Sequence, residues 1–265
     1  MSAARERPSI AEMRAKAQPP ALLERRSGEH WMGRLYLRRF SVVFSRVLVG
    51  TGTAPNAITA VMIVVGLLGA VAAAFVPGIV GALLTVVLIQ AYMLLDCIDG
   101  EVARFTGRIS ITGVFLDRVG HYLCEAGLLV ALGFRAAEGG LVGGYPMLGL
   151  AAALGAILIK SETDLVHVAR AAHGAPATTD EAAAPRSGGI ATLRRLAQAT
   201  QFHRVILAAE LSLLILLAAV IDAAAGGAPH SQLPATRVLL VGCAVVAGVQ
   251  TVLHLFAILS SKRLR

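Results

Sequence analysis

Apolar stretches separated by short polar segments dominate the sequence from residue 56 onward. Each stretch is close to the roughly 20 residues with which an α-helix crosses a bilayer. Six spans are predicted, near residues 57–76, 79–98, 113–134, 141–159, 205–221 and 238–259. Between residues 34 and 48, basic and apolar positions alternate at helical spacing, which predicts an amphipathic helix in the membrane interface; a solvated amphipathic helix is the alternative. The pattern predicts an all-α fold, an integral membrane bundle of six transmembrane helices preceded by this amphipathic interfacial helix.

Composition supports the membrane class and suggests how the chain is divided. Of the 265 residues, 56% are hydrophobic and 15% are charged, and the mean hydropathy is +0.72. These values lie outside the range of soluble globular proteins. We assign residues 1–55 to a polar cytoplasmic tail and the interfacial helix, and residues 56–265 to one six-helix transmembrane domain. Within it, residues 166–202 are predicted to form a cytoplasmic loop with a Pro-, Ala- and Thr-rich middle.

The distribution of lysine and arginine predicts the orientation. Segments 1–56, 99–112, 160–204 and 260–265 hold ten, two, six and three basic residues, whereas the opposite side holds only Arg135 and Arg237. The positive-inside rule therefore places both termini in the cytoplasm, in a bacterial-type inner (plasma) membrane. The net charge of +8 does not indicate a nucleic-acid partner, because the basic residues flank apolar spans and form no groove interleaved with aromatic residues. Membrane lipids with anionic headgroups, and phosphates, are the expected partners.

Three carboxylates and an arginine lie where the second and third predicted spans approach the cytoplasm. Asp96 and Asp99 are three residues apart, and Asp117 and His121 are four apart, so each pair leaves one face of a helix. A carboxylate at the bilayer centre costs about 3 kcal/mol, so three unpaired ones would strongly oppose insertion. A bound divalent cation removes this conflict, because two opposed acidic faces make the oxygen-rich pocket that a hard cation prefers. Arg104 adds a planar fork of donors suited to phosphate.

The same stretch carries a spaced motif. Its fixed positions are Asp96, Asp99, Gly100, Ala103, Arg104, Gly113 and Asp117. This spacing resembles the signature DxxDGxxARx8GxxxDxxxD of the integral-membrane CDP-alcohol phosphotransferases. Only the last position departs from that signature, because His121 stands where a fourth aspartate is expected. More loosely, the run TAPNAIT (residues 53–59) resembles the start of that family's first span. A chance cluster, or a polar patch between helices, is the alternative interpretation.

The resemblance implies an activity, a metal and a set of partners. Members of this family move a phosphatidyl or other substituted phosphoryl group from CDP-diacylglycerol or another CDP-alcohol to an alcohol or phosphorylated alcohol, releasing CMP in the synthesis of phospholipids and related lipids. One or two ions of Mg²⁺ or Mn²⁺ are implied, with Asp96, Asp99, Asp117 and His121 at the metal-binding positions. The implied nucleotide-binding positions are Asp96, Gly100, Ala103, Arg104 and Gly113. A homodimer is also implied by the family alone, and the acceptor stays open among inositol phosphate, glycerol phosphate, serine and other alcohols.

His121 is the most informative departure, because the family's fourth aspartate is a metal ligand and is thought to act as the general base. An imidazole, with an unperturbed pKa of about 6.5, can take a proton at neutral pH. Its nitrogen is a poorer ligand for Mg²⁺ than oxygen, which favours Mn²⁺ or Zn²⁺ or leaves only one ion. Base, metal ligand and packing residue in a repurposed site therefore remain open, with His121 and Asp117 as the candidate catalytic pair. Glu125, one turn further along the helix, could replace the lost carboxylate.

The acceptor site and the rival functions are less constrained. Basic residues at cytoplasmic helix ends could bind an acceptor phosphate or merely anchor the helices to headgroups; these are Lys160, Arg194, Arg195 and Arg204. His254 could line a pocket or form a hydrogen bond between helices. One rival function is a noncatalytic scaffold or CDP- or lipid-binding protein of the same fold. Another is a UbiA-like prenyltransferase, which should have a second Asp-rich motif that is absent from the sequence. A transporter fits less well, because the charged cluster lies toward one side of the membrane.

Overall fold

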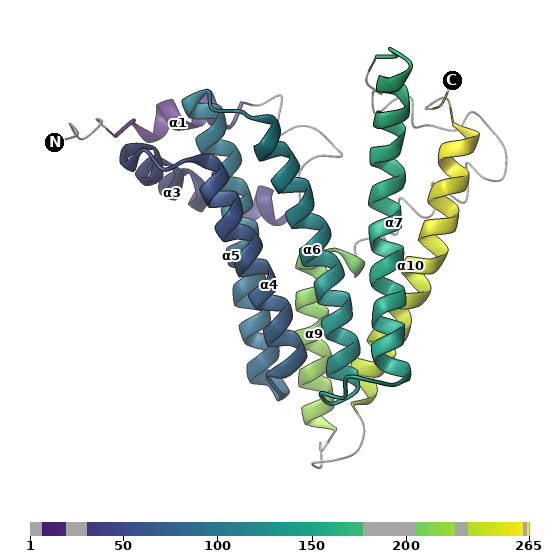
Figure 1. Cartoon of the computed structure of the whole chain (residues 1–265). Coiled ribbons are helices and arrows are strands. Elements are labelled where there is room, and N and C mark those ends of the chain that lie inside the picture. Colours follow the sequence, from purple (N-terminus) through teal and green to yellow (C-terminus); the bar gives the residue numbers. More distant parts are fainter. Residues whose placement is uncertain (1–6, 20–30, 177–204, 226–232, 262–263, 265) are drawn as a thin grey trace. The chain divides into compact units, whose positions relative to one another are not determined.

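The computed structural model describes residues 7–19, 31–176, 205–225, 233–261 and 264 (Figure 1). Within these residues the chain is all α-helical, as predicted, with eight α-helices and a π-helical segment. The elements are α1 (Ile10–Ala17), η1 (Gly33–Leu37), α3 (Arg38–Thr51), α4 (Pro55–Phe75), α5 (Gly78–Thr106), α6 (Ile111–Ala136), α7 (Gly144–Ala172), α9 (Ala208–Ala224) and α10 (Pro234–Ser260).

Four of the described helices, α4, α5, α7 and α10, are long and apolar enough to cross a membrane. They indicate an integral membrane protein, as the sequence predicted. The other two predicted spans correspond to α6 and α9. The first carries Asp117, Arg118, Glu125 and Arg135, and the second has 17 residues. The count of six spans therefore stays a prediction.

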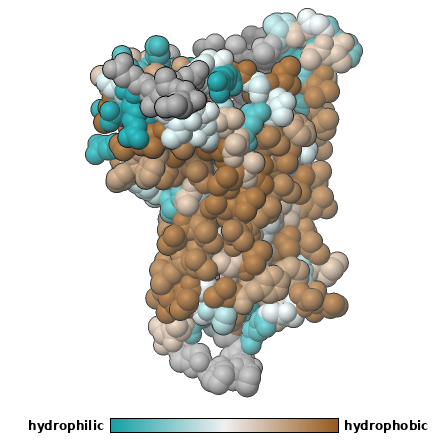
Figure 2. All heavy atoms as spheres, turned by 60° about the vertical axis from the view of Figure 1, so that its left-hand side comes forward, coloured by the Kyte–Doolittle hydropathy of each residue, from teal (hydrophilic) through white to brown (hydrophobic). Residues whose placement is uncertain are grey.

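Large apolar side chains cover the outside of these helices. On α4, for example, the exposed fractions of Val61, Val64 and Leu68 are 52%, 56% and 51%. The face drawn in Figure 2 is correspondingly rich in hydrophobic residues along the helices. Contact of this much apolar surface with water would be costly, whereas contact with lipid chains is not. The surface therefore agrees with the membrane class.

The predicted loop at residues 166–202 begins too early. Helix α7 continues to Ala172, so residues 166–172 are helical, and residues 177–202 lie outside the described part of the chain. The apolar run ends at the polar residues that begin with Lys160, but the helix does not. Val166, beyond them, is buried, so this extension still has an apolar face that packs inward. The helix stops where Gly174 adopts a φ of 66°, a conformation that glycine reaches without steric cost.

The chain forms two compact units, residues 1–69 with 87–123 and residues 70–86 with 124–265. In the first unit, α1 packs against α3 and α5. Its Met13 and Ala17 are fully buried and join a cluster with Val42, Ile98 and Val102. A capping box starts α1, because Ser9 and Glu12 exchange hydrogen bonds, which also hold the pKa of Glu12 below its usual value. The N-terminal segment is therefore part of the folded unit.

Helix α3 overlaps the stretch predicted to be amphipathic, residues 34–48, and continues to Thr51, but its two faces are unusual. Phe40, Phe44 and Val47 are exposed, whereas the hydroxyl residues Ser41 and Ser45 are fully buried. An outward apolar face is the one that would enter a membrane interface. The inward hydroxyls need hydrogen-bond acceptors inside the unit, since a buried polar group without a partner is costly.

In the second unit, α10 packs closely along α7. A Cβ added to Gly155 of α7 would lie 3.0 Å from the side chain of Ala247, so this glycine permits the close approach. Further along the pair, Thr163 Oγ1 and His254 Nε2 are 2.9 Å apart and share a hydrogen bond. His254 thus has the second of its two predicted roles, a polar contact between helices.

Arg135 of α6 stabilises the end of α4 and the start of α5. Its guanidinium, in a side chain that is 6% exposed, donates to the carbonyl oxygens of Ala73, Val76 and Gly78 at 3.3, 3.3 and 2.6 Å. A cation is favourable at a helix C-terminus, where the carbonyls lack intrahelical partners. We expect Arg135→Met to lower the free energy of unfolding by about 3 kcal/mol, measured by denaturant unfolding in detergent.

Arg237 provides the matched control for this substitution. It donates to Ala136 O and to the partly exposed Glu138, at 3.3 and 3.2 Å, and its side chain is 27% exposed. Arg237→Met should therefore cost about 1 kcal/mol or less. Equal losses in the two variants would contradict the capping role of Arg135.

Candidate functional site

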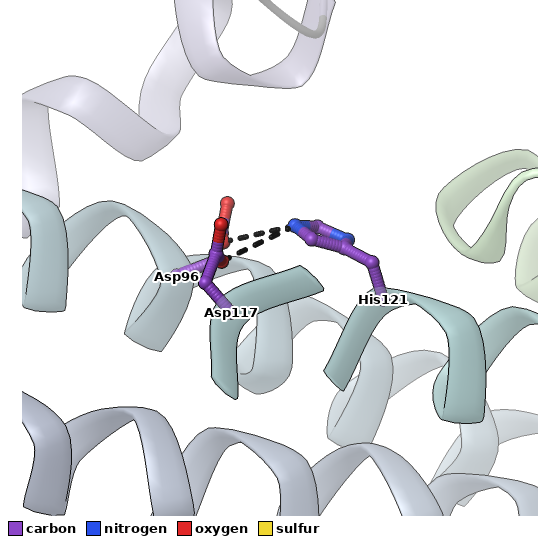
Figure 3. A group of neighbouring side chains, drawn as sticks. All are labelled: Asp96, Asp117 and His121. Atoms are coloured by element: carbon purple, nitrogen blue, oxygen red, sulfur yellow. Dashed lines mark hydrogen bonds and ion pairs between the residues drawn. The ribbon is translucent and has the colours of Figure 1, made fainter. Parts of the chain in front are cut away.

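Asp96, Asp117 and His121 converge in the first unit (Figure 3). Asp96 comes from α5, and the other two come from adjacent turns of α6. His121 Nε2 lies 3.2 Å from Asp96 Oδ1 and 3.6 Å from Asp117 Oδ1. The turn between the helices is short because Gly107 adopts a φ of 67° and Ser110 Oγ accepts from the backbone N–H of Gly113, in the first turn of α6. The three side chains therefore lie together, as their spacing in the sequence predicted.

This group can hold a metal ion. One potential ligand atom from each of the three residues lies within 4.8 Å of the other two, and all three side chains are half-buried. Two carboxylates with one imidazole suit several divalent ions, since carboxylate oxygen favours Mg²⁺ and Mn²⁺ while nitrogen favours the later transition metals. The donor set fits a divalent cation but does not select one, so Mg²⁺ or Mn²⁺ stays a prediction.

A cavity of about 390 Å³ opens beside the group. This volume is in the range of small-molecule sites. The cavity is lined by acids, by arginines and by small residues from α3, α4, α5, the turn after α5 and the start of α6. These include Asp96, Asp99, Asp117, Arg38, Arg104, Arg108, Asn56, Thr59, Gly100, Ala103, Ser110 and Gly113. Every residue predicted to contact a nucleotide is among them.

Asp99 lines the same cavity but is not one of the three grouped residues. It is 7% exposed, and its Oδ2 accepts a hydrogen bond of 2.6 Å from Thr59 Oγ1. Thr59 belongs to the run that loosely resembles the start of the family's first span. This hydrogen bond and the one between Ser110 and Asn56 connect the two stretches of the resemblance, although Asp99 as a metal ligand stays a prediction.

The motif glycines leave room for polar side chains. A Cβ added to Gly100 would lie 3.0 Å from Nη1 of Arg104, and one added to Gly113 would lie 2.8 Å from Oδ1 of Asn56. The Arg104 guanidinium is also held by a hydrogen bond of 2.8 Å from its Nε to the carbonyl oxygen of Ala17. The missing side chains at these two positions therefore leave space for a guanidinium and an amide at the cavity wall.

Tyr92 is a site residue that the sequence reasoning missed. It is 1% exposed, and its hydroxyl lies 2.7 Å from His121 Nδ1. Two arrangements fit these partners: Nε2–H donates to Asp96 while Nδ1 accepts from the Tyr92 hydroxyl, or, with a cation beside Asp96, Nδ1–H donates to the Tyr92 oxygen and Nε2 keeps its lone pair for the metal. A signal for this residue exists, because Tyr92 precedes Asp96 by four residues and so shares its helix face.

The remaining predicted residues are not brought into this group. Glu125 and Lys160, both in the second unit, form an ion pair of 3.0 Å with each other. Glu125 is 7% exposed, and Lys160 is therefore its neutralising partner. Arg194, Arg195 and Arg204 lie outside the described residues. Replacement of the lost carboxylate by Glu125, and acceptor binding by the four basic residues, stay predictions.

Helix α1 helps to position Arg104, a residue of the cavity wall. Met13 is fully buried, and the end of α1 supplies the Ala17 carbonyl that holds Arg104. We expect Met13→Asp to displace α1, because it buries a charge in an apolar cluster, and to lower the free energy of unfolding by about 3 kcal/mol. Denaturant unfolding in detergent measures this; Ala15→Asp, at an exposed position of the same helix, should unfold like the wild type.

Comparison with known proteins identifies no family, since no protein-family model matches the chain and no curated protein matches it.

Proposed function

We propose that this protein is a metal-dependent CDP-alcohol phosphotransferase of the membrane, which transfers a phosphatidyl or other substituted phosphoryl group from a CDP-linked donor to an alcohol and releases CMP. The observation that carries the proposal is the convergence of Asp96, Asp117 and His121 beside a cavity lined by the other motif residues. Asp96, Asp99 and Asp117 all line this cavity, and carboxylates of this kind can hold the cation of a metal–diphosphate complex.

The charges of the cavity also favour a phosphate ligand. Acids and arginines line it together, with Asp96, Asp99 and Asp117 beside Arg104 and Arg108. A cation held by the acids and an anion held by the guanidinium groups are both present in a metal–diphosphate complex. Asn56 and Ser110, linked by a hydrogen bond of 3.3 Å, add neutral donors that can recognise a sugar or a base.

The residues divide the work of the transfer among them. Asp96 and Asp117 would hold a divalent cation, which when bound neutralises charge on the phosphoryl oxygens. The acceptor oxygen forms a bond to the donor's second phosphorus, and the bond from that phosphorus to the CMP oxygen breaks. His121 Nε2 would either join the two aspartates as a ligand or, with its lone pair unbound, accept the proton of the acceptor hydroxyl, and Tyr92 orients the ring in both cases.

The membrane placement belongs to the same proposal. Helices α6 and α9 would join α4, α5, α7 and α10 as spans, giving six; at 1.5 Å per residue their 26 and 17 residues are close to the hydrocarbon thickness or exceed it. Residues 56–265 then form the catalytic domain, and α3 lies in the interface. Both termini and the site face the cytoplasm, where nucleotide-activated donors are made, and the protein acts as a homodimer.

The direct test is release of CMP from CDP-diacylglycerol by the purified protein. The assay uses a panel of acceptors (inositol phosphate, glycerol phosphate and serine) with Mg²⁺ or Mn²⁺. Metal-dependent release that needs one acceptor supports the proposal and names the substrate. Metal-dependent binding of CDP-diacylglycerol without release under any condition would instead favour the noncatalytic alternative, in which His121 marks a repurposed site.

A further inference from the structure

A second acidic group lies in the first unit, behind the cavity. The carboxylate of Glu101 is fully buried. Its Oε1 accepts hydrogen bonds from Gln18 Nε2, Arg38 Nη1 and Ser41 Oγ at 2.8, 3.2 and 2.6 Å, and its Oε2 accepts one from Ser45 Oγ at 2.7 Å. The carboxylate of Glu101 therefore supplies the acceptors for the inward hydroxyls of α3, Ser41 and Ser45.

Burying the charges of Glu101 and Arg38 costs more free energy than packing the same helices through apolar side chains would. A buried ion pair is often no more stabilising than apolar side chains of the same volume, because both charges lose their hydration. Glu101 follows Gly100 of the motif, and its partners come from α1 and α3. The cost of burying the Glu101 carboxylate therefore points to a function for one of the residues that it binds.

That residue is Arg38, the partner of Glu101 that also lines the cavity. Its side chain is 18% exposed, and its Nη1 donates to the fully buried Glu101 at 3.2 Å. A guanidinium carries five N–H donors in a planar fork, so Arg38 can keep its bond to Glu101 and also donate to an anion in the cavity. Phosphate suits such a fork, because its oxygens can accept two of these hydrogen bonds at once.

We propose that Arg38 binds a phosphate group in the cavity and that Glu101 holds its guanidinium in place for this purpose. The substrate to which that phosphate belongs rests on the proposed function, either the donor's diphosphate or a phosphorylated acceptor. Phosphate binding itself can be measured without any transfer.

The experiment titrates full-length protein in lipid nanodiscs with inorganic pyrophosphate and with inorganic phosphate, each with Mn²⁺ present. Arg38→Ala is expected to weaken binding of at least one probe by roughly 10- to 100-fold, the effect of losing a charge-assisted pair of hydrogen bonds. Arg39→Ala removes the same charge from the neighbouring, exposed position of α3 and should leave both affinities within about twofold. Equal weakening in the two variants would reduce the role of Arg38 to general electrostatics and overturn the proposal.

A second variant separates binding from folding. Arg38→Ala alone leaves the buried Glu101 without its cation and is expected to lower the thermal unfolding temperature. The double variant Arg38→Ala with Glu101→Gln removes both charges, so its unfolding temperature should recover toward the wild-type value while its affinity stays as low as that of Arg38→Ala. Recovery of affinity together with stability would show that Arg38 is only structural.

The probes also identify the source of the phosphate. A loss confined to pyrophosphate assigns Arg38 to the donor's diphosphate, and a loss confined to inorganic phosphate assigns it to an acceptor phosphate. If the wild type binds a probe through Arg38 but releases no CMP, the proposed function fails and this inference stands. If CMP is released but Arg38→Ala binds both probes normally, the inference fails and the function stands. A wild type that binds neither probe overturns the inference.

Discussion

Asp96→Asn is expected to abolish metal binding and CMP release, with activity falling by about 10³-fold or more. The substitution keeps the size and the hydrogen-bonding capacity of the side chain but removes the anionic oxygen nearest to His121, at 3.2 Å. An anionic ligand contributes several kcal/mol to a divalent site, and each 1.4 kcal/mol corresponds to a factor of about ten. Titration with Mn²⁺, followed by its paramagnetic resonance signal, measures the metal, and the CMP assay measures the transfer.

Asp99→Asn is the matched control, because it removes the same charge from the same cavity. Asp99 lies outside the grouped residues and accepts a hydrogen bond from Thr59, which an asparagine oxygen can also accept. Mn²⁺ should therefore still bind to this variant, with CMP release reduced by about 10- to 100-fold, the effect typical of residues that support a metal site from outside. If both variants lose Mn²⁺ binding equally, Asp99 is a ligand as the motif predicts, and the metal group is larger than Asp96, Asp117 and His121.

Which parts of the site could be predicted depends on the sequence separation of the partners. Asp117 and His121 share a helix face because they are four residues apart, and opposing them to Asp96 requires only a short turn after α5. The Glu101 network could not be predicted, since Gln18, Arg38 and Ser45 lie 83, 63 and 56 residues from it. In the sequence, a glutamate at that position is one more charge near a helix end, and only packing shows that it is fully buried.

The fold shows the same division. Apolar length predicts a helix that lies in lipid, because lipid demands apolar side chains on every outward face. It does not predict where such a helix ends, as α7 shows by continuing past Lys160 and Glu162 to Ala172. Nor could it predict that α1, outside every apolar run, docks through Met13 and Ala17. Helix ends and docked segments depend on a few local contacts that hydropathy does not record.

His121→Ala is expected to abolish the transfer, whereas His121→Asp should keep part of it. The alanine variant loses both the atom that can accept the acceptor's proton and a potential ligand beside Asp96 and Asp117. General base catalysis alone contributes about 10²- to 10⁴-fold. Aspartate restores an oxygen ligand and a weaker base, which is the arrangement that the resemblance implies, and CMP release in Mg²⁺ and in Mn²⁺ measures each variant.

Two measurements, the metal preference and the effect of Tyr92→Phe, distinguish whether His121 is a metal ligand, a base or a packing residue. If the imidazole is a ligand, the wild type should prefer Mn²⁺, and His121→Asp should shift the preference toward Mg²⁺, because an oxygen has replaced a nitrogen. If it is only the base, that preference stays unchanged, while Tyr92→Phe, which removes the hydrogen bond to Nδ1, lowers CMP release about tenfold. Full activity in His121→Ala would leave the imidazole neither role, and proton transfer would then have to be assigned to Asp117, the other candidate in the catalytic pair.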